Sequence, residues 1–396
     1  MKRWAGVGPG VMIAAAFIGP GTVTTATLAG ARFGTTLLWA LAFATIATIV
    51  LQEMSARLGL ATGTGLGQAL RSVKGPPWLG MTLASLAAVA VIGGAAAYQA
   101  GNLTGAGLGL ASATGLPLRV WVGIGAILSG ALLWTGQYKL VERVLASCVA
   151  IMGVVFLATA SLVVPHLGDV AKGMFVPRLP GGAELTALAL IGTTIVPYNL
   201  FLHAALVREK WSSIDDLPSV RWDLILAIGL GGIVSSAVVV TASAALDGAD
   251  VRSASDMAAQ LRPLLGPWAG HAFAVGYAAA GISSSVTAPL AAAYTLLDAL
   301  GRRRDVTTPL ARSVWGGCIF VGTGAALIGF RPIPLIFLAQ LVNGLVLPIV
   351  AIVLLVAMND RQRLGDHVNG WRGNVAGIAV VTLCVVLGVR AIVLAF

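Results

Sequence analysis

Eleven stretches of apolar residues, each about 20 residues long or longer, follow one another along the chain. A helix needs about 20 apolar residues to cross the hydrocarbon core of a bilayer, so each stretch predicts one membrane-spanning helix. The expected spans cover residues 9–30, 37–59, 78–104, 119–138, 144–165, 185–207, 223–246, 267–299, 311–330, 332–357 and 374–395. We therefore expect an all-α polytopic membrane protein with eleven transmembrane helices.

Composition excludes a sizeable soluble domain. Hydrophobic residues make up 58% of the 396 residues and charged residues only 10%, whereas soluble domains carry roughly 25% charged residues. We read residues 1–396 as a single transmembrane domain in contact with the lipid bilayer. No basic cluster lies on a soluble module, so a nucleic acid is not expected as a partner. Cys148, Cys318 and Cys384 lie in apolar runs and predict packing residues rather than disulfides or metal ligands.

The positive charges predict the orientation. When the N-terminus is placed inside, 17 of the 25 Lys and Arg residues fall on the cytoplasmic side and eight on the other side. Cytoplasmic ends of spans carry the excess of Lys and Arg. We therefore expect a cell (inner) membrane protein with a cytoplasmic N-terminus and, because the number of spans is odd, a C-terminus outside.

Two of the expected spans are interrupted by proline. The first contains Gly19-Pro20-Gly21-Thr22, and about 175 residues later the sixth contains Val196-Pro197-Tyr198-Asn199. Proline removes a backbone donor and clashes with the preceding turn, and irregular backbone at membrane depth is tolerated only where protein buries it or it lines a cavity. Paired interrupted helices are typical of the substrate site of a secondary transporter.

The spacing of the two interruptions indicates an inverted repeat. Spans 1 and 6 are five spans apart, which is an odd number, so the second unit starts on the opposite side of the membrane. We expect repeats at about residues 5–165 and 180–358, with an additional helix at about 374–395. No nucleophile–base pair and no nucleotide-binding motif accompanies them, so the prediction is a gradient-driven transporter that works by alternating access, not an enzyme, and it needs no cofactor.

Several short stretches resemble one known family. In chain order they are Gly8-Pro9-Gly10, Ala29-Gly30-Ala31-Arg32-Phe33-Gly34, Ser55-Ala56-Arg57-Leu58-Gly59, Asn199-Leu200-Phe201-Leu202-His203, Ala280-Gly281 with Ser283-Ser284, Asp360-Arg361, and Gly365-Asp366-His367. From end to end the chain is similar to the NRAMP divalent-metal transporters of the LeuT-like (APC) superfamily. The resemblance implies a 5+5 inverted repeat with broken helices 1 and 6, and metal–proton symport.

The residues that carry the family's chemistry differ here. The family's span-1 motif Asp-Pro-Gly-Asn reads Gly19-Pro20-Gly21-Thr22, and its span-6 motif Met-Pro-His reads Val196-Pro197-Tyr198. In the family those Asp, Asn and Met side chains hold the metal, while acids of span 3 and two span-6 histidines carry protons. Residues 78–104 contain no acid, and only the second histidine remains, as His203. No metal is expected at these family positions.

These differences leave three hypotheses for the substrate. A divalent cation near the midplane needs compensating charge, because its desolvation costs several kcal/mol, and Gly19 supplies none. Helix ends after Gly21, with Thr22, Tyr198 and Asn199 beside them, favour a small anionic or zwitterionic solute. The alternatives are a proton-coupled Mn²⁺ or Mg²⁺ transporter with an atypical site, and a sensor that does not transport.

Four further polar residues are candidates for the same pathway. Gln340 matches a family glutamine of the substrate site, and Asn343 lies three residues further along the same expected helix face. His203 and Glu53 are candidates for a proton route, because ionisable groups inside a membrane are functional candidates by default. Arg57 stands four residues after Glu53, however, so a helix-face ion pair is the alternative for that acid.

Overall fold

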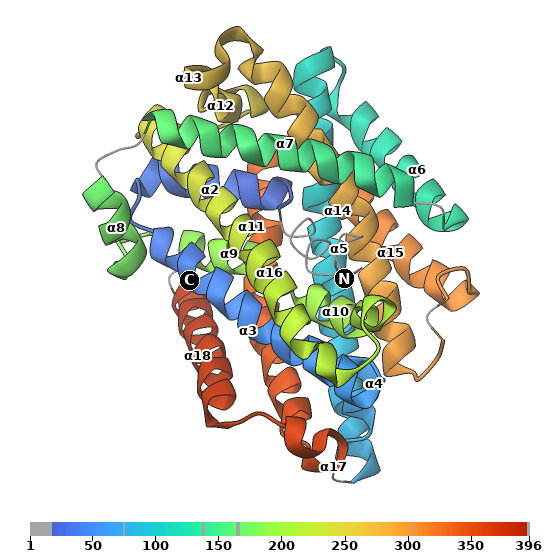
Figure 1. The fold of residues 1–396 in the computed structure, drawn as a ribbon. Coiled ribbons are helices and arrows are strands. Elements are labelled where there is room, and N and C mark those ends of the chain that lie inside the picture. The colour runs from blue at the N-terminus through green and yellow to red at the C-terminus, as the bar shows by residue number, and fades with distance from the viewer. Residues whose placement is uncertain (1–17, 74–75, 137–138, 164–166, 304, 394–396) are drawn as a thin grey trace, which may run out of the picture.

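The computed structural model describes residues 18–393 except for residues 74–75, 137–138, 164–166 and 304, and this part of the chain is helical with no strand. Long helices run side by side in a bundle, and short helices join them at its two ends (Figure 1). Because the polypeptide is this apolar, the helices satisfy their own backbone hydrogen bonds and the bundle hides the remaining polar groups.

The elements follow one another in the order of the expected spans. Their bounds are α2 (Pro20–Phe33), α3 (Leu38–Thr62), α4 (Leu66–Arg71), α5 (Pro77–Thr114), α6 (Leu118–Thr135), α7 (Lys139–Val163), α8 (Leu167–Phe175), α9 (Glu184–Thr194), α10 (Pro197–Lys210), η1 (Ile214–Asp216), α11 (Leu217–Ala245), α12 (Ala254–Ala259), α13 (Arg262–Leu265), η2 (Gly266–Trp268), α14 (Ala269–Ala299), α15 (Pro309–Leu327), α16 (Pro332–Met358), α17 (Arg361–Leu364), η3 (Gly365–His367) and α18 (Trp371–Val393).

Ten spans within the described residues are long and apolar enough to cross a membrane. They correspond to the second to eleventh predicted spans, so the polytopic all-α prediction is confirmed. The first predicted span begins at residue 9, and only its part from residue 18 onward is described. The count of eleven therefore stays a prediction.

Both predicted interruptions coincide with the start of a helix within the described residues. α2 begins at Pro20, and the sixth span consists of α9 and α10, which are separated at Ile195 and Val196 and resume at Pro197. Each proline occupies the first turn of its helix, where its missing N–H has no helical partner to lose. The half-helix thus starts at Pro20 rather than after Gly21 as we expected.

The broken helices lie at the centre of the bundle. In the span Glu184–Lys210, 94% of the apolar window is buried, against 22% for Leu118–Thr135. α5 packs along α14, α15 and α16, and α2 packs against α11. Small residues allow these contacts: a side chain at Gly105 of α5 would collide with Pro20, since its Cβ would lie 2.2 Å from the Pro20 Cβ. Close helix contacts of this kind hold bundles together in lipid.

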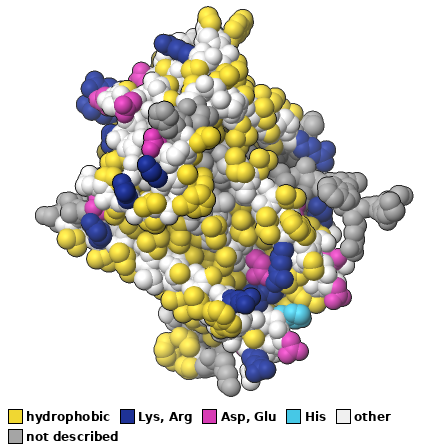
Figure 2. Space-filling view, turned by 60° about the vertical axis from the view of Figure 1, so that its left-hand side comes forward, with side chains coloured by type: hydrophobic (Ala, Val, Ile, Leu, Met, Phe, Trp, Pro, Cys, Tyr) yellow, Lys and Arg dark blue, Asp and Glu magenta, His cyan; other side chains and the backbone are white. Residues whose placement is uncertain are grey.

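The outer surface suits a lipid environment. Apolar side chains cover most of the face in Figure 2, whereas basic and acidic side chains gather toward its margins. Many of the fully exposed side chains are large and apolar, such as Ile127, Phe320 and Ile328. All three cysteines are free thiols, and two of them, Cys318 and Cys384, are buried, in agreement with their expected role in packing.

Candidate substrate site at the two helix breaks

The start of α2 presents an uncapped helix end inside the bundle. Gly19 is its N-cap residue, its backbone is extended, and no side chain of the described chain caps it. α10 starts in the same way after Val196. The first N–H groups of a helix have no intrahelical acceptor, and they carry the positive end of the helix dipole. Two such ends therefore face the centre of the protein.

A hydrogen bond between two threonines joins the broken helices. Thr22 Oγ1 of α2 lies 2.8 Å from Thr193 Oγ1 of α9, and both residues are buried. Thr193 lies next to the last residue of α9, so it reaches the start of the other half-helix. This contact places the first and sixth spans in register at their breaks.

Gly19 and Gly21 let neighbouring side chains approach the backbone closely. A Cβ at Gly21 would lie 2.1 Å from Gln340 Nε2, and a Cβ at Gly19 would lie 3.0 Å from Ser284 Oγ. The amide of Gln340, from α16, thus occupies the space beside the start of α2. Ser284, from α14, covers the position that precedes Pro20. Substituting either glycine would displace a polar group of the site.

Aromatic rings form another wall. Tyr98 of α5 and Tyr198 of α10 pack edge to face, with ring centroids 5.7 Å apart. Both rings are buried, and Asn199 lies next to Tyr198 at the start of α10. The site is thus enclosed by side chains from six helices, namely α2, α5, α9, α10, α14 and α16.

Several polar atoms around the breaks are buried without a hydrogen-bond partner. They include Asn199 Oδ1, Gln340 Oε1, Tyr198 Oη, Ser284 Oγ and both side-chain polar atoms of Asn343. A buried polar atom without a partner is costly, and it usually indicates water, an ion or a ligand. Most of these atoms can accept a hydrogen bond. The arrangement can therefore bind a small polar species through neutral groups.

Ionised ligands do not converge here. Among the described residues, no group of three or more His, Cys, Asp or Glu side chains could hold a metal ion. Any cation bound at the breaks would contact carbonyl, amide and hydroxyl oxygens, which hard cations such as Mg²⁺ accept. These side chains offer no thioether or thiolate sulfur, the ligands that select soft metals.

Most of the predicted site residues begin one of the two half-helices. Gly19, Pro20, Gly21 and Thr22 begin α2, and Val196, Pro197, Tyr198 and Asn199 begin α10, as the sequence predicted. Gln340 reaches the break at α2. Asn343, three residues further on, lies against α5 as Gln340 does, with its Oδ1 3.3 Å from the Cβ position of Gly94.

Two residues of the site were missed by sequence reasoning. Thr193 was not singled out, although its place just before the break was a usable signal. Ser284 was quoted only within a stretch that carries the family resemblance. Tyr98 lies at the site through its contact with Tyr198.

His203 lies about two turns beyond the break on α10, roughly one turn after Tyr198 and Asn199. Its Nδ1 is 3.0 Å from Gln52 Oε1 of α3, and its Nε2 is buried without a partner. Because an amide oxygen can only accept, Nδ1 carries the proton and Nε2 retains its lone pair. The ring is therefore arranged as a proton acceptor.

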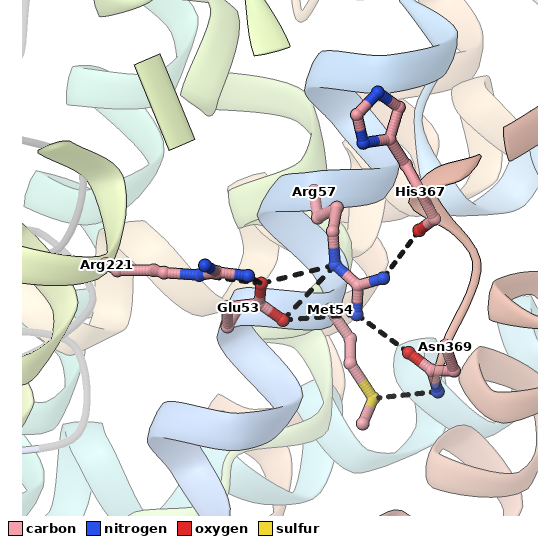
Figure 3. A network of polar contacts seen from close by, with 6 residues as sticks. All are labelled: Glu53, Met54, Arg57, Arg221, His367 and Asn369. Atoms are coloured by element: carbon pink, nitrogen blue, oxygen red, sulfur yellow. Dashed lines mark hydrogen bonds and ion pairs between the residues drawn. The ribbon is translucent and has the colours of Figure 1, made fainter. Parts of the chain in front are cut away.

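Glu53 follows Gln52 directly but belongs to a different set of contacts (Figure 3). It forms ion pairs with Arg57 at 3.2 Å and with Arg221 of α11 at 2.7 Å. Arg57 also donates to the His367 carbonyl oxygen and to Asn369 Oδ1. The geometry of Glu53 thus agrees with the ion-pair alternative, because both of its carboxylate oxygens accept hydrogen bonds from arginine.

Hydrogen bonds also hold the rest of α2. Thr24 shares a 2.6 Å hydrogen bond with Tyr277 of α14. Gln260, which follows α12, donates to Thr27 Oγ1 and accepts from Thr241 Oγ1. A short helix outside the spans is thereby tied to the broken helix.

A bundle with two central broken helices and a polar site between them defines the class of secondary transporters with a LeuT-like fold. Residues 10–394 match the family described as "Natural resistance-associated macrophage protein-like". The chain therefore belongs to the Nramp family, whose members are transporters and not enzymes.

Known relatives agree with this assignment. The chain is 29% identical over 398 residues to the divalent metal cation transporter MntH of Acidiphilium cryptum, and the match covers 98% of this chain and 89% of that protein. A crystal structure of the Eremococcus coleocola manganese transporter superposes with a TM-score of 0.80 at 20% identity, covering 98% of this chain and 85% of that one. MhsT in complex with L-phenylalanine, at 16% identity and full coverage of both chains, gives 0.63.

Proposed function

We propose that this protein is a secondary transporter that moves a divalent cation of the Mn²⁺ or Mg²⁺ type across the cell membrane by alternating access. The proposal is supported by membership of the Nramp family and by the MntH relative, which is named as a divalent metal cation transporter. It replaces our first expectation of an anionic or zwitterionic solute, which these relatives do not support.

The observation that carries the proposal is the set of unpartnered acceptor atoms at the breaks. Asn199 Oδ1 and Gln340 Oε1 are buried and lack a donor, and the waters around a metal ion are strong donors. Mg²⁺ gives up its water reluctantly and usually keeps several waters when bound. A partly hydrated ion thus fits a neutral site better than a bare one. Without a carboxylate, binding should be weak and should discriminate little among divalent ions.

Proton coupling is part of the proposal. Nε2 of His203 is a basic nitrogen of α10 that is buried without a partner, and α10 is predicted to run from the site toward the cytoplasm. We assign the proton route to His203 and give Glu53 a structural role. The bias of Lys and Arg supports a cytoplasmic N-terminus.

A second candidate, transport of a small anionic or zwitterionic solute, is favoured by one feature. Both half-helices begin without a side-chain cap, and uncapped helix N-termini attract anions. Such a solute would take its hydrogen bonds from backbone N–H groups rather than donate to Asn199 and Gln340.

Flux in proteoliposomes separates these possibilities. We expect the purified chain to take up Mn²⁺ and Mg²⁺ with half-saturation in the millimolar range, faster when the lumen is alkaline. Asn199→Leu should reduce this uptake at least tenfold, whereas the control Thr323→Val, on α15, should leave it unchanged. Uptake of a radiolabelled carboxylate or amino acid without any metal flux would favour the second candidate. Ligand-dependent thermal stabilisation without flux of either kind would indicate a sensor.

A further inference from the structure

A groove with a volume of about 660 Å³ lies between α3, α11 and α18, away from the helix breaks. Its apolar lining comprises Ile49, Val50, Leu224, Ile225 and Ala376. Its charged lining comprises Glu53, Arg57, Arg221, Asp366 and Arg372. The groove thus combines an apolar wall with a charged end.

The charged side chains at that end of the groove differ in how many hydrogen bonds and ion pairs they form. Glu53 is held by Arg57 and Arg221, and the other donors of Arg57 bind the His367 carbonyl oxygen and Asn369. Arg221 uses Nε and Nη2 on Glu53, and its side chain is still 52% exposed. The guanidinium of Arg372 lies over the Trp371 ring, 5.5 Å from its centroid, and within the described part of the chain it forms no hydrogen bond or ion pair. Two arginines therefore face the groove with unused donors, against the single exposed carboxylate of Asp366.

Tryptophans indicate the depth of this charged end in the membrane. Trp222 and Trp371 adjoin Arg221 and Arg372 in sequence, and they are 65% and 72% exposed. Exposed tryptophans gather at the level of lipid headgroups. One turn further into the membrane, the groove is lined by Ile225, which is exposed, and by Ala376, which is partly exposed. The groove therefore continues from headgroup depth to the depth of the acyl chains.

We propose that this groove binds an anionic glycerophospholipid, with its phosphate at Arg221 and Arg372 and an acyl chain along Ile225 and Ala376. Guanidinium groups pair with phosphate oxygens through charge-assisted hydrogen bonds, and basic pockets between transmembrane helices recognise lipid headgroups. In Figure 2, basic and acidic side chains with a histidine beside them gather below a broad hydrophobic surface, the pattern that such a site requires. The bound phosphate would extend the Glu53 network, which already joins α3 to α11 and to the segment before α18.

Lipid binding to the full-length protein in detergent tests this proposal. Native mass spectrometry should show one phosphatidylglycerol retained per chain, and added phosphatidylglycerol should raise the apparent Tm more than phosphatidylcholine does. Arg372→Gln should weaken retention at least fivefold. Among the described residues, its guanidinium lies only over the exposed Trp371 ring and forms no hydrogen bond or ion pair, so this variant should fold. Arg221→Gln is the second variant, and Arg302→Gln, an exposed arginine outside the groove, is the matched control.

Three results would overturn the proposal. They are equal retention and stabilisation with phosphatidylcholine, full reproduction of the thermal shift by inorganic phosphate alone, and unchanged phosphatidylglycerol retention in both Arg372→Gln and Arg221→Gln. An equal loss in Arg302→Gln would likewise show that surface charge alone determines retention.

Discussion

The helix breaks and the Glu53 network differ in the charge of their side chains and in how many of their polar atoms have a partner. At the breaks, the side chains are neutral and several of their polar atoms have no partner. In the network, a single carboxylate is shared by two arginines, and one of these is also bound to a carbonyl and an amide. Burying a charge is costly unless it is fully paired. Charged side chains thus lie where ion pairs and hydrogen bonds satisfy them, whereas the polar atoms at the helix breaks remain available to a polar ligand.

The largest expected effect comes from removing the shared carboxylate. Glu53→Gln leaves Arg57, whose side chain is only 10% exposed, facing Arg221 without compensation. Breaking one partner of a buried pair costs about 3–5 kcal/mol, and partial exposure should reduce this to about 2–4 kcal/mol. Thermal unfolding in detergent measures the change.

The exposed pair of Lys172 and Asp169, 3.9 Å apart, provides the control. Asp169→Asn should change stability by no more than about 1 kcal/mol. Equal effects of the two substitutions would mean that the network is no more than a surface ion pair.

Adding a carboxylate at the helix breaks tests whether the absence of charge there limits cation binding. Gly19→Asp should raise the affinity for Mn²⁺ at least tenfold, about 1.4 kcal/mol, because a carboxylate compensates the ion. The new side chain would press on Ser284, whose Oγ lies 3.0 Å from the added Cβ, so Gly19→Asp with Ser284→Ala should bind more tightly still. Isothermal titration reads the affinity.

Without metal, the same variant should unfold at a lower temperature than the parent, because the carboxylate is buried alone. Adding Mn²⁺ should raise the unfolding temperature of the variant and so remove this difference from the parent. No gain in Mn²⁺ affinity in either variant would show that charge is not what the site lacks.

Displacing a neutral group should affect transport more than folding. In Gly21→Ala, the new Cβ would lie 2.1 Å from Gln340 Nε2, the end of a flexible side chain that can move away. We expect flux to fall about tenfold, with a loss of stability below about 1.5 kcal/mol.

Gly30→Ala is the matched substitution on the same helix. Its Cβ would meet the Val239 carbonyl oxygen at 2.4 Å, and backbone cannot move aside as easily. Here stability should fall by about 1–3 kcal/mol. Normal flux in Gly21→Ala would exclude the Gln340 amide from the site.

The smallest expected effect lies outside the spans, at Asp256 of α12. Partial burial opposes its charged form, but hydrogen bonds from the backbone N–H groups of Arg252 and Ser253 outweigh this and lower the pKa of Asp256. Asp256→Asn should cost about 1 kcal/mol, as loss of a helix cap does.

The pH dependence of this contribution follows from the lowered pKa. The stabilisation should be fully present above the unfolded-state pKa of about 3.9 and lost as pH falls through the lower folded-state pKa. Unfolding of both proteins between pH 6 and pH 3 measures it, and a difference that grows on acidification would contradict this account.

The sequence predicted features that depend on neighbouring residues, but it did not predict contacts between residues far apart in the chain. Spans and breaks were predictable because hydropathy and proline act on neighbouring residues. Arg57 as a partner of Glu53 followed from helical spacing, but Arg221, 168 positions away, did not. Ser284 has ordinary local surroundings, and only packing directs it to the break at α2. Asn343 was expected to share a face with Gln340, and both side chains lie against α5; its part in the site stays a prediction.

The hydrogen bond between Thr22 and Thr193 has a consequence for motion. It joins the first helix of one predicted repeat to the first helix of the other, 171 positions apart in the chain. The two half-helices cannot tilt independently while this hydrogen bond is present, so tilting one of them moves the other. The two hydroxyl groups thereby couple the predicted repeats when both move together, and this coupling ends when the hydrogen bond breaks.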